Sequence, residues 1–372
     1  KVERKNLKKV VRGVMVSLLF LVLIGSELVA ETEKKPFKGQ TIIATCWSSG
    51  FCEGLQPAIE ALEKRTGGKV EIVPAWEALY AKIKASPKNQ PPWDVVMSDP
   101  MEYSVLRNAG FLLPIREENI PNIKNIFPSV RKSKKYMDGY GVIVGGEPTI
   151  PMFNPHCLTF KPTSWKDFLR PELKGKISIN KYWWVENLYQ AAYMLDEEEG
   201  AKEIYTDLDA VYKKAAEVAQ HSKLAYTSTD LIRSLIISGD VAMANDYGCA
   251  VARGRRQGTY DGYLPKEGYT GYFSILSVVR GTQHRDLAEA WINEFLTEEA
   301  QAGEVESGGG WSVNMYQKEP AWMFEEEYKD LVLNTDEAWQ KILIPDYDYF
   351  RKNWDELQER YQKEVISQIG KG

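Results

Sequence analysis

The sequence predicts an α/β protein built on parallel strands. Strand-like and helix-like patterns alternate in the order 38–45, 55–66, 69–75, 77–85, 91–99 and 103–109. Strands that alternate with amphipathic helices form βαβ units, in which each helix packs on a sheet of parallel strands. The chain has 372 residues, which is long enough for two domains with sizeable cores.

The ends of these early elements carry local signals. The first helix stops at Gly67-Gly68 and the third at Gly110, where glycine accepts the backbone conformation that ends a helix. Ligands in such sheets bind beyond the carboxyl ends of the strands. The segments "WSS" after the first strand and Ser98-Asp99 after the third both occupy that kind of position.

The rest of the chain predicts a second α/β region. We expect extended strands at 141–155 and a strand after a helix and turn in 161–180, and most of the last fifty or so residues to be helical. Trp93, Trp165 and Trp291 fall inside element patterns, which indicates packing rather than binding. The further expected elements are a helix in 181–195, helix, strand and helix in 235–258, and a strand and long helix in 271–301.

The first thirty residues predict a secretory signal peptide and therefore a periplasmic location. A basic stretch at 1–12 precedes an apolar run at 14–25, and the small residue Ala30 suits the position before a cleavage. The alternative is an uncut membrane anchor. The apolar run is short for a spanning helix, which needs about 20 residues.

Export favours disulfides among the four cysteines, because an oxidising compartment preserves them. Four cysteines allow three connectivities. We expect Cys46 to pair with Cys52 across a short loop, which leaves Cys157 and Cys249 as the second pair. Four separate buried thiols are the alternative.

Composition and motifs argue against several classes of function. The net charge is -5 and the pI about 5.6, with no basic stripe that would bind nucleic acid. The chain shows no zinc pattern, no nucleophile elbow and no phosphate-binding loop in its expected context. Paired acids such as Glu186 and Asp246 keep a secreted hydrolase open as the less favoured alternative.

Several stretches resemble the solute-binding proteins of bacterial ABC importers, and among them the spermidine/putrescine-binding family. The similar pieces are "GDVAMA", "DYGCA" before "VAR", "LPKEG", the strand from Tyr272, "AEAWINEFL" and "PTSWKDFLRPELKGKISI". "CWSS" and "WDVVMSD" fit the ends of the family's first and third strands. The resemblance extends over residues 39 to about 316.

This resemblance implies a two-lobed periplasmic-binding-protein fold of type II. Its mixed sheets are flanked by helices, and its lobes close on a ligand cleft by a hinge motion. The implied lobes are 39–146 with 272–316, and 147–271 with 317–372. Such a protein is expected to work as a monomer without a cofactor or bound metal, and to deliver its solute to membrane permease subunits.

The resemblance also places the candidate ligand-binding residues. The family's aromatic and hydroxyl pair after the first strand corresponds to Trp47 and Ser48, and its third-strand turn to Asp99. The family's remaining binding positions correspond to Trp184, Asn187, Asp246, Tyr272, Ser274 and Gly310, with Tyr247 and Trp311 as neighbours.

Three of these positions carry carboxylates in the polyamine binders. In this chain they are Trp184, Asn187 and Ser274, so all three carboxylates are lost. A linear polycation needs spaced carboxylates to offset the desolvation of its ammonium groups. We therefore expect a small polar solute that is not a typical polyamine. An amine-bearing, quaternary ammonium or zwitterionic compound fits the aromatic residues. An oxyanion, such as a phosphonate or carboxylate, and ferric iron stay open as alternatives.

Overall fold

The computed structural model describes residues 35–75, 78–196, 201–307, 310–317, 330–331, 333 and 335–371. The predicted signal peptide at 1–30 lies outside these residues. Among them, eleven strands form one mixed sheet in the order β2-β1-β3-β9-β4-β7-β5-β6, with β8 and β10 on β4 and β11 on β9. None of the described helices is both long and apolar enough to cross a membrane.

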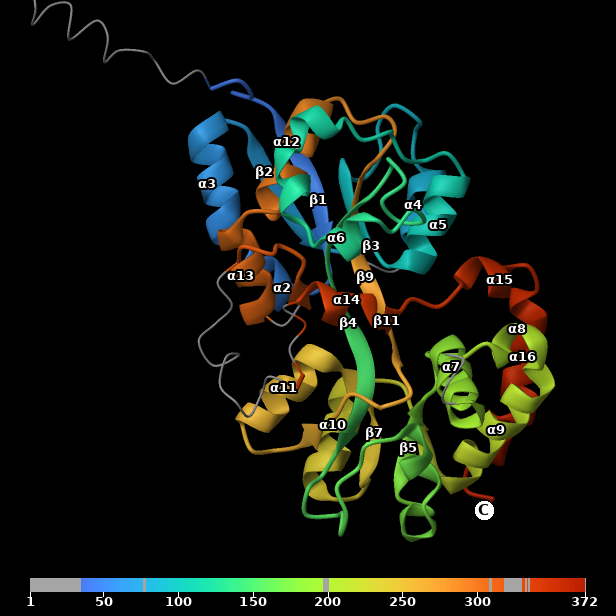
Figure 1. The fold of residues 1–372 in the computed structure, drawn as a ribbon. Helices are drawn as coiled ribbons and strands as arrows, with labels where there is room; N and C mark the ends of the chain where they lie inside the picture. The colour runs from blue at the N-terminus through green and yellow to red at the C-terminus, as the bar shows by residue number, and fades with distance from the viewer. Residues whose placement is uncertain are drawn as a thin grey trace, which may run out of the picture.

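Two long strands, β4 (Val142–Phe153) and β9 (Tyr269–Val278), run between the two halves of the molecule (Figure 1). Every residue of β4 is buried. The β4 strand pairs antiparallel with β9 as far as Pro148, and antiparallel with β7 (Met243–Tyr247) from Thr149 onward. Because β4 belongs to both pairings, it carries the sheet from one half into the other.

The first half is built on β1 (Thr41–Cys46), which pairs in parallel with β2 (Lys69–Pro74) and β3 (Val95–Ser98). The predicted order of strands and helices is confirmed here. The first predicted helix, 55–66, is α3, which ends before Gly67, whose φ of 75° is the left-handed turn that glycine accepts, and a short helix that was not predicted, α2, comes before it. The helices are α2 (Ser49–Gly54), α3 (Gln56–Thr66), α4 (Leu79–Ala85), α5 (Pro100–Asn108) and α6 (Pro128–Arg131).

The second half is built on β5 (Ile177–Asn180), which pairs in parallel with β6 (Ser222–Tyr226) and β7. The helix expected in 161–180 is a short 3₁₀ turn, Trp165–Leu169, because Pro171 disfavours a helical conformation at the preceding residue. The helices are α7 (Trp184–Leu195), α8 (Glu203–Thr206), α9 (Leu208–His221), α10 (Thr229–Ser238) and α11 (Gly248–Arg256), and β8 is Asp261–Gly262.

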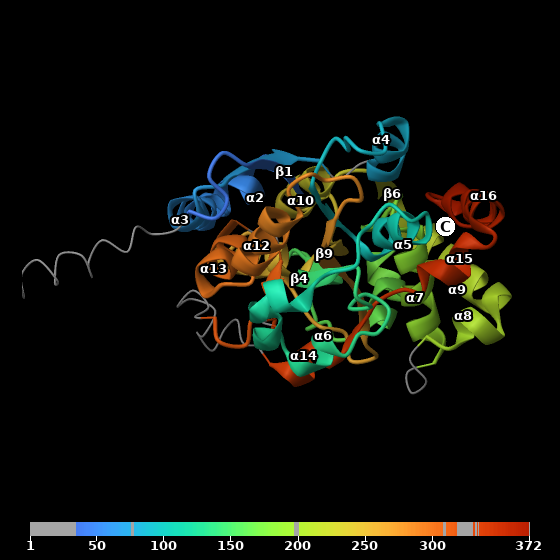
Figure 2. The same ribbon diagram turned by 90° about the horizontal axis from the view of Figure 1, so that it is seen from above.

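After β9 the chain returns to the first half. The single long helix expected in 271–301 is two helices, α12 (Arg285–Phe295) and α13 (Glu298–Ser307), followed by β10 (Trp311–Ser312). From above, α3, α12 and α13 form one group, and α7, α8 and α9 lie on the other side of the sheet (Figure 2). This confirms an α/β fold with a mixed sheet flanked by helices.

The C-terminal segment contacts both halves (Figure 1). It holds α14 (Asp336–Gln340), β11 (Ile342–Leu343), α15 (Tyr347–Arg351) and α16 (Trp354–Glu364). Asp336 of α14 accepts the backbone N–H of Ser129 in α6 over 2.7 Å, whereas α16 packs on α9. The lobe boundaries of the sequence analysis stay predictions.

The predicted core is confirmed. Trp165 and Trp291 are fully buried, and Trp93 is 8% exposed. The second predicted disulfide is wrong, because Cys157 and Cys249 are not bonded to each other. Cys249 begins α11, where its backbone N–H binds Glu147 of β4, and Cys157 packs near Gly239 after α10. The two thiols therefore belong to different parts of the second half.

Candidate functional site

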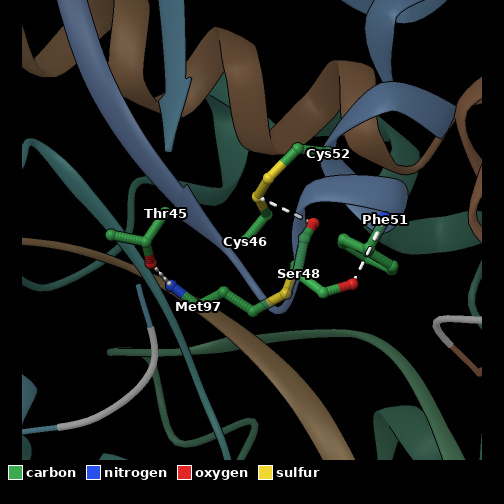
Figure 3. Close-up of a disulfide and its surroundings, with 6 residues drawn as sticks. All are labelled: Thr45, Cys46, Ser48, Phe51, Cys52 and Met97. Carbon is green, nitrogen blue, oxygen red and sulfur yellow. Dashed lines mark hydrogen bonds between the residues drawn. A yellow bond between two sulfur atoms is a disulfide. The ribbon is translucent and has the colours of Figure 1, made fainter. Parts of the chain in front are cut away.

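A disulfide between Cys46 and Cys52 ties the end of β1 to α2 (Figure 3). This confirms the first predicted bridge. Ser48 caps α2, since its Oγ accepts the backbone N–H of Phe51 over 3.4 Å. The ring of Phe51 is buried and stacks on Phe295 of α12. The short loop that carries Trp47 is thus held at both ends.

Four aromatic side chains form a row from the first half into the second. Trp47 meets Tyr272 of β9 edge-to-face, with ring centroids 6.1 Å apart, and Tyr272 meets Tyr247 at 5.4 Å. The ring centroid of Tyr247 lies 4.8 Å from that of Trp183, the residue before α7. All four residues are only partly buried. We call these four residues the aromatic row.

Two acids, one from each half, lie near this row. Asp99 caps α5, where its Oδ1 accepts the backbone N–H of Glu102 over 2.7 Å. Desolvation raises the pKa of Asp99 to about 6, against the opposing effect of that hydrogen bond. Glu186, in the first turn of α7, accepts the hydroxyl of Tyr347 over 2.6 Å.

Burial raises the pKa of Glu186, and the negative charge of Asp99 raises it further. The two carboxyl groups therefore lie within electrostatic range of each other. Burial also raises the pKa of the Tyr247 hydroxyl. The negative charges of nearby acids raise it further, and these acids are Glu147, Asp246, Glu186 and Asp99. Among the described residues, no Lys or Arg side chain forms a salt bridge with Asp99 or Glu186. Four acids thus act on the Tyr247 hydroxyl.

Asp246 differs from these acids because its charge is paired. Arg233 of α10 binds it with two hydrogen bonds, from Nε over 2.6 Å and from Nη2 over 2.9 Å. Asp246 is fully buried, and burial raises its pKa while the Arg233 hydrogen bond and charge lower it. Breaking such a pair leaves an uncompensated buried charge. Asp246 therefore has a partner within the chain already.

Two further predicted ligand residues lie in the packing between α7 and α16. Trp184 is 2% exposed, and its ring meets Trp354 at 4.7 Å and Phe350 at 5.5 Å. Asn187 donates to the hydroxyl of Tyr361 over 2.8 Å. A small cavity lies beside Asn187 and Tyr361 in this core, and no residue of the aromatic row lines it.

Gly310 and Trp311 lie at the start of β10, beside β4. Gly310 has a φ of 137°, and Trp311 is fully buried opposite Gly146. The structure therefore brings Trp47, Asp99, Tyr247, Tyr272 and Ser274 into one neighbourhood and sets Trp184 and Asn187 apart from it. Their contacts with a ligand stay predictions.

Sequence reasoning did not place Trp183, Glu186 and Tyr347 among the ligand-binding residues, and it named Glu186 only as a possible paired acid. Trp183 and Glu186 lie one position before Trp184 and Asn187, so a shift of one residue in "WWVEN" would have found them. Tyr347 comes from the C-terminal segment, more than 150 residues from Glu186, and carries no local signal. Among the residues that the structure describes, no group of three His, Cys, Asp or Glu side chains is arranged to hold a metal ion.

Comparison with known proteins identifies the family. Residues 90–353 match the family described as bacterial extracellular solute-binding protein, and this range is more than half of the chain. The chain belongs to this family. The resemblance seen in the sequence is thereby confirmed, and the family implies a periplasmic or extracellular location. None of the curated proteins matches the chain.

Solved structures share the fold of this solute-binding protein. A spermidine/putrescine ABC transporter substrate-binding protein from Streptococcus pneumoniae has a TM-score of 0.72 at 18% identity, covering 88% of this chain and 99% of its own. An ABC transporter protein from Clostridium perfringens gives 0.71 at 18% identity, with 87% and 99% covered. A GABA receptor gives 0.69 at 19% identity, with 87% and 97% covered.

Proposed function

We propose that this solute-binding protein is the receptor of an ABC uptake transporter and captures a small organic cation. The cation carries an amine or a quaternary ammonium group, alone or in a zwitterion. The protein works as a periplasmic monomer, exported by its signal peptide. It binds without chemical conversion of the solute and delivers it to the membrane permease when its two lobes close.

The aromatic row is the observation that carries this proposal. It combines rings from the first half, from the crossing strand β9 and from the second half. A cation over the face of an aromatic ring gains about 0.5–2 kcal/mol, with more when it is desolvated. A solute held by rings from both halves stabilises the arrangement in which the halves lie together.

The acids beside the row support a cation over an anion. Asp99 and Glu186 bring like charges from opposite halves, and neither forms a salt bridge with a described Lys or Arg. Buried charges in proteins are normally paired. A bound cation would supply the missing partner and remove the repulsion between the halves.

A thermal-shift screen of the purified protein tests the proposal. The panel holds choline, betaine, γ-aminobutyrate, spermidine, a phosphonate and ferric citrate. A ligand at 100 times its Kd adds about 2.7 kcal/mol to the free energy of unfolding, which is a clear rise in Tm. We expect a rise with a small amine or quaternary ammonium compound.

Each other outcome has a defined meaning. A strong preference for spermidine would contradict the expectation of a solute other than a polyamine, and would assign its ammonium groups to Asp99 and Glu186. A response confined to the phosphonate or ferric citrate would overturn the cation and favour the oxyanion or iron alternative. Turnover of any panel compound would indicate an enzyme instead of a receptor.

A further inference from the structure

Glu147 is a buried acid that the proposed function does not use. It lies in β4 where this strand crosses between the halves, and it is 2% exposed. The strand register places it directly opposite Tyr272 of β9. Tyr272 is the ring of the aromatic row that contacts both Trp47 and Tyr247.

Both oxygens of the Glu147 carboxylate accept hydrogen bonds from neutral groups. Oε1 accepts the hydroxyl of Tyr272 over 3.0 Å, and Oε2 accepts the backbone N–H of Cys249 over 2.8 Å. The Cys249 thiol is a further hydrogen-bond partner of the carboxylate. Each carboxylate oxygen of Glu147 therefore already has a donor within the chain.

None of these contacts brings a positive charge to the Glu147 carboxyl group. Burial raises its pKa, and the hydrogen bonds of Cys249 and Tyr272 and the charge of Arg253 lower it. No salt bridge joins Glu147 to a described Lys or Arg, and Arg253 acts on it through space only. A cation nearby favours the ionised carboxylate, because opposite charge stabilises it.

A phenol that donates to a carboxylate becomes more electron-rich, since hydrogen bonds to charged acceptors are strong and polarise the donor. A more electron-rich ring attracts a cation more strongly over its face. The hydrogen bond from Tyr272 to Glu147 thus affects the ring that lies between Trp47 and Tyr247.

We propose that Glu147 is a positioning residue that sets specificity for a quaternary ammonium headgroup. Its carboxylate holds the Tyr272 ring in the aromatic row and makes the ring face more negative. A quaternary ammonium group suits this arrangement because it has no N–H group and donates no hydrogen bond to the carboxylate. This inference rests on the proposed binding of an organic cation.

Choline and its neutral isostere 3,3-dimethyl-1-butanol test the inference by isothermal titration calorimetry. Glu147→Gln keeps the shape, since its amide can accept from Cys249 and donate to the Tyr272 oxygen, but it removes the charge. We expect this variant to weaken choline binding about tenfold, a change of the size of one cation–π contact, and to leave the alcohol unaffected.

Tyr272→Phe and the double variant complete a cycle. If Glu147 acts through the Tyr272 hydroxyl, the double variant binds choline no more weakly than Glu147→Gln alone. Glu267→Gln is the matched control, because Glu267 is also a buried acid that accepts neutral donors, Ser164 and the Trp165 N–H, away from the row. This control should leave choline binding unchanged.

Four results overturn the inference. Equal losses for choline and the alcohol would show a purely structural role, and additive losses in the double variant would show that Glu147 acts independently of Tyr272. Binding of a primary amine but not of choline would contradict specificity for a quaternary ammonium headgroup and would leave the proposed function unchanged. A protein that binds no cation of the panel would refute both.

Discussion

The indole N–H of Trp47 donates a hydrogen bond to Oγ of Ser274 over 2.8 Å, across 227 residues of sequence. Ser274 is fully buried in β9, so this bond fixes the indole against the crossing strand. It also leaves the partly exposed ring edge-to-face with Tyr272. One contact thus orients the first ring of the aromatic row.

Trp47→Ala should lower the affinity for the solute by at least tenfold, because it removes a ring of the row. The fold should survive, since the Trp47 side chain is only partly buried. Ser274→Ala, which keeps the ring and loses its anchor, should lower the affinity less. Calorimetry of both variants checks this, and an unchanged affinity of Trp47→Ala would remove Trp47 from the site.

Trp183 and Trp184 should respond in opposite ways to substitution. Trp184→Ala empties a buried space between α7 and α16 and should lower the free energy of unfolding by about 3–5 kcal/mol. Trp183→Ala should change stability little and weaken binding. Denaturant titration and calorimetry separate the two effects, with Tyr316→Ala as an exposed aromatic control. A loss of binding in stably folded Trp184→Ala would assign Trp184 to the ligand instead.

Solute affinity should depend on pH through Asp99. Its pKa of about 6 in the ligand-free protein means that a proton must leave before the carboxylate can pair with a cation. Affinity should be constant above about pH 7 and fall by up to about tenfold per unit below pH 6. The raised pKa of Glu186 acts in the same direction.

Asp99→Asn should bind more weakly at pH 7 and show a flatter pH profile, measured by calorimetry between pH 5 and 8. The raised pKa of Asp99 also makes the stability of the folded protein depend on pH. Because the folded pKa exceeds the unfolded value of about 3.9, the folded state holds the proton longer. The Asp99 contribution to stability of the ligand-free protein therefore falls as pH rises from about 4 to 6. A profile identical to that of the wild type would exclude Asp99 as the titrating group.

Loss of the Cys46–Cys52 disulfide should lower the free energy of unfolding by about 2 kcal/mol, the chain-entropy value for so short a loop. Solute affinity should fall as well, since the Trp47 loop lies between the two cysteines. The Cys46→Ser/Cys52→Ser double variant tests both by denaturant titration and calorimetry. Cys157→Ser is the control, because this thiol forms no disulfide. Unchanged affinity in the double variant would show that the bridge does not position Trp47.

The order of elements was readable from the sequence because its signals are local. Strand runs, helix periodicity and the stop at Gly67 each depend on a few neighbouring residues. The short Cys46–Cys52 bridge was predictable for the same reason. Where such signals were incomplete, the elements differed: the helix expected in 161–180 is a 3₁₀ turn, and the long helix expected in 271–301 is two helices.

The composition of the candidate site was decided by tertiary contacts. Nearly every residue of α7 is buried, so its apolar pattern does not tell which face meets the ligand, and the packing of α16 settles where Trp184 and Asn187 lie. The sequence gives no sign that Asp246 pairs with Arg233, because the two residues belong to different elements.

Tyr347 and Glu147 show the same limit. One reaches the site from the C-terminal segment, and the other meets Tyr272 only through the pairing of two crossing strands. The sequence by itself therefore determined the family, the layers of the fold and the aromatic character of the candidate site. Only the tertiary structure decided which acids stay unpaired there, because the partner of a buried charge is set by three-dimensional packing and not by distance along the chain.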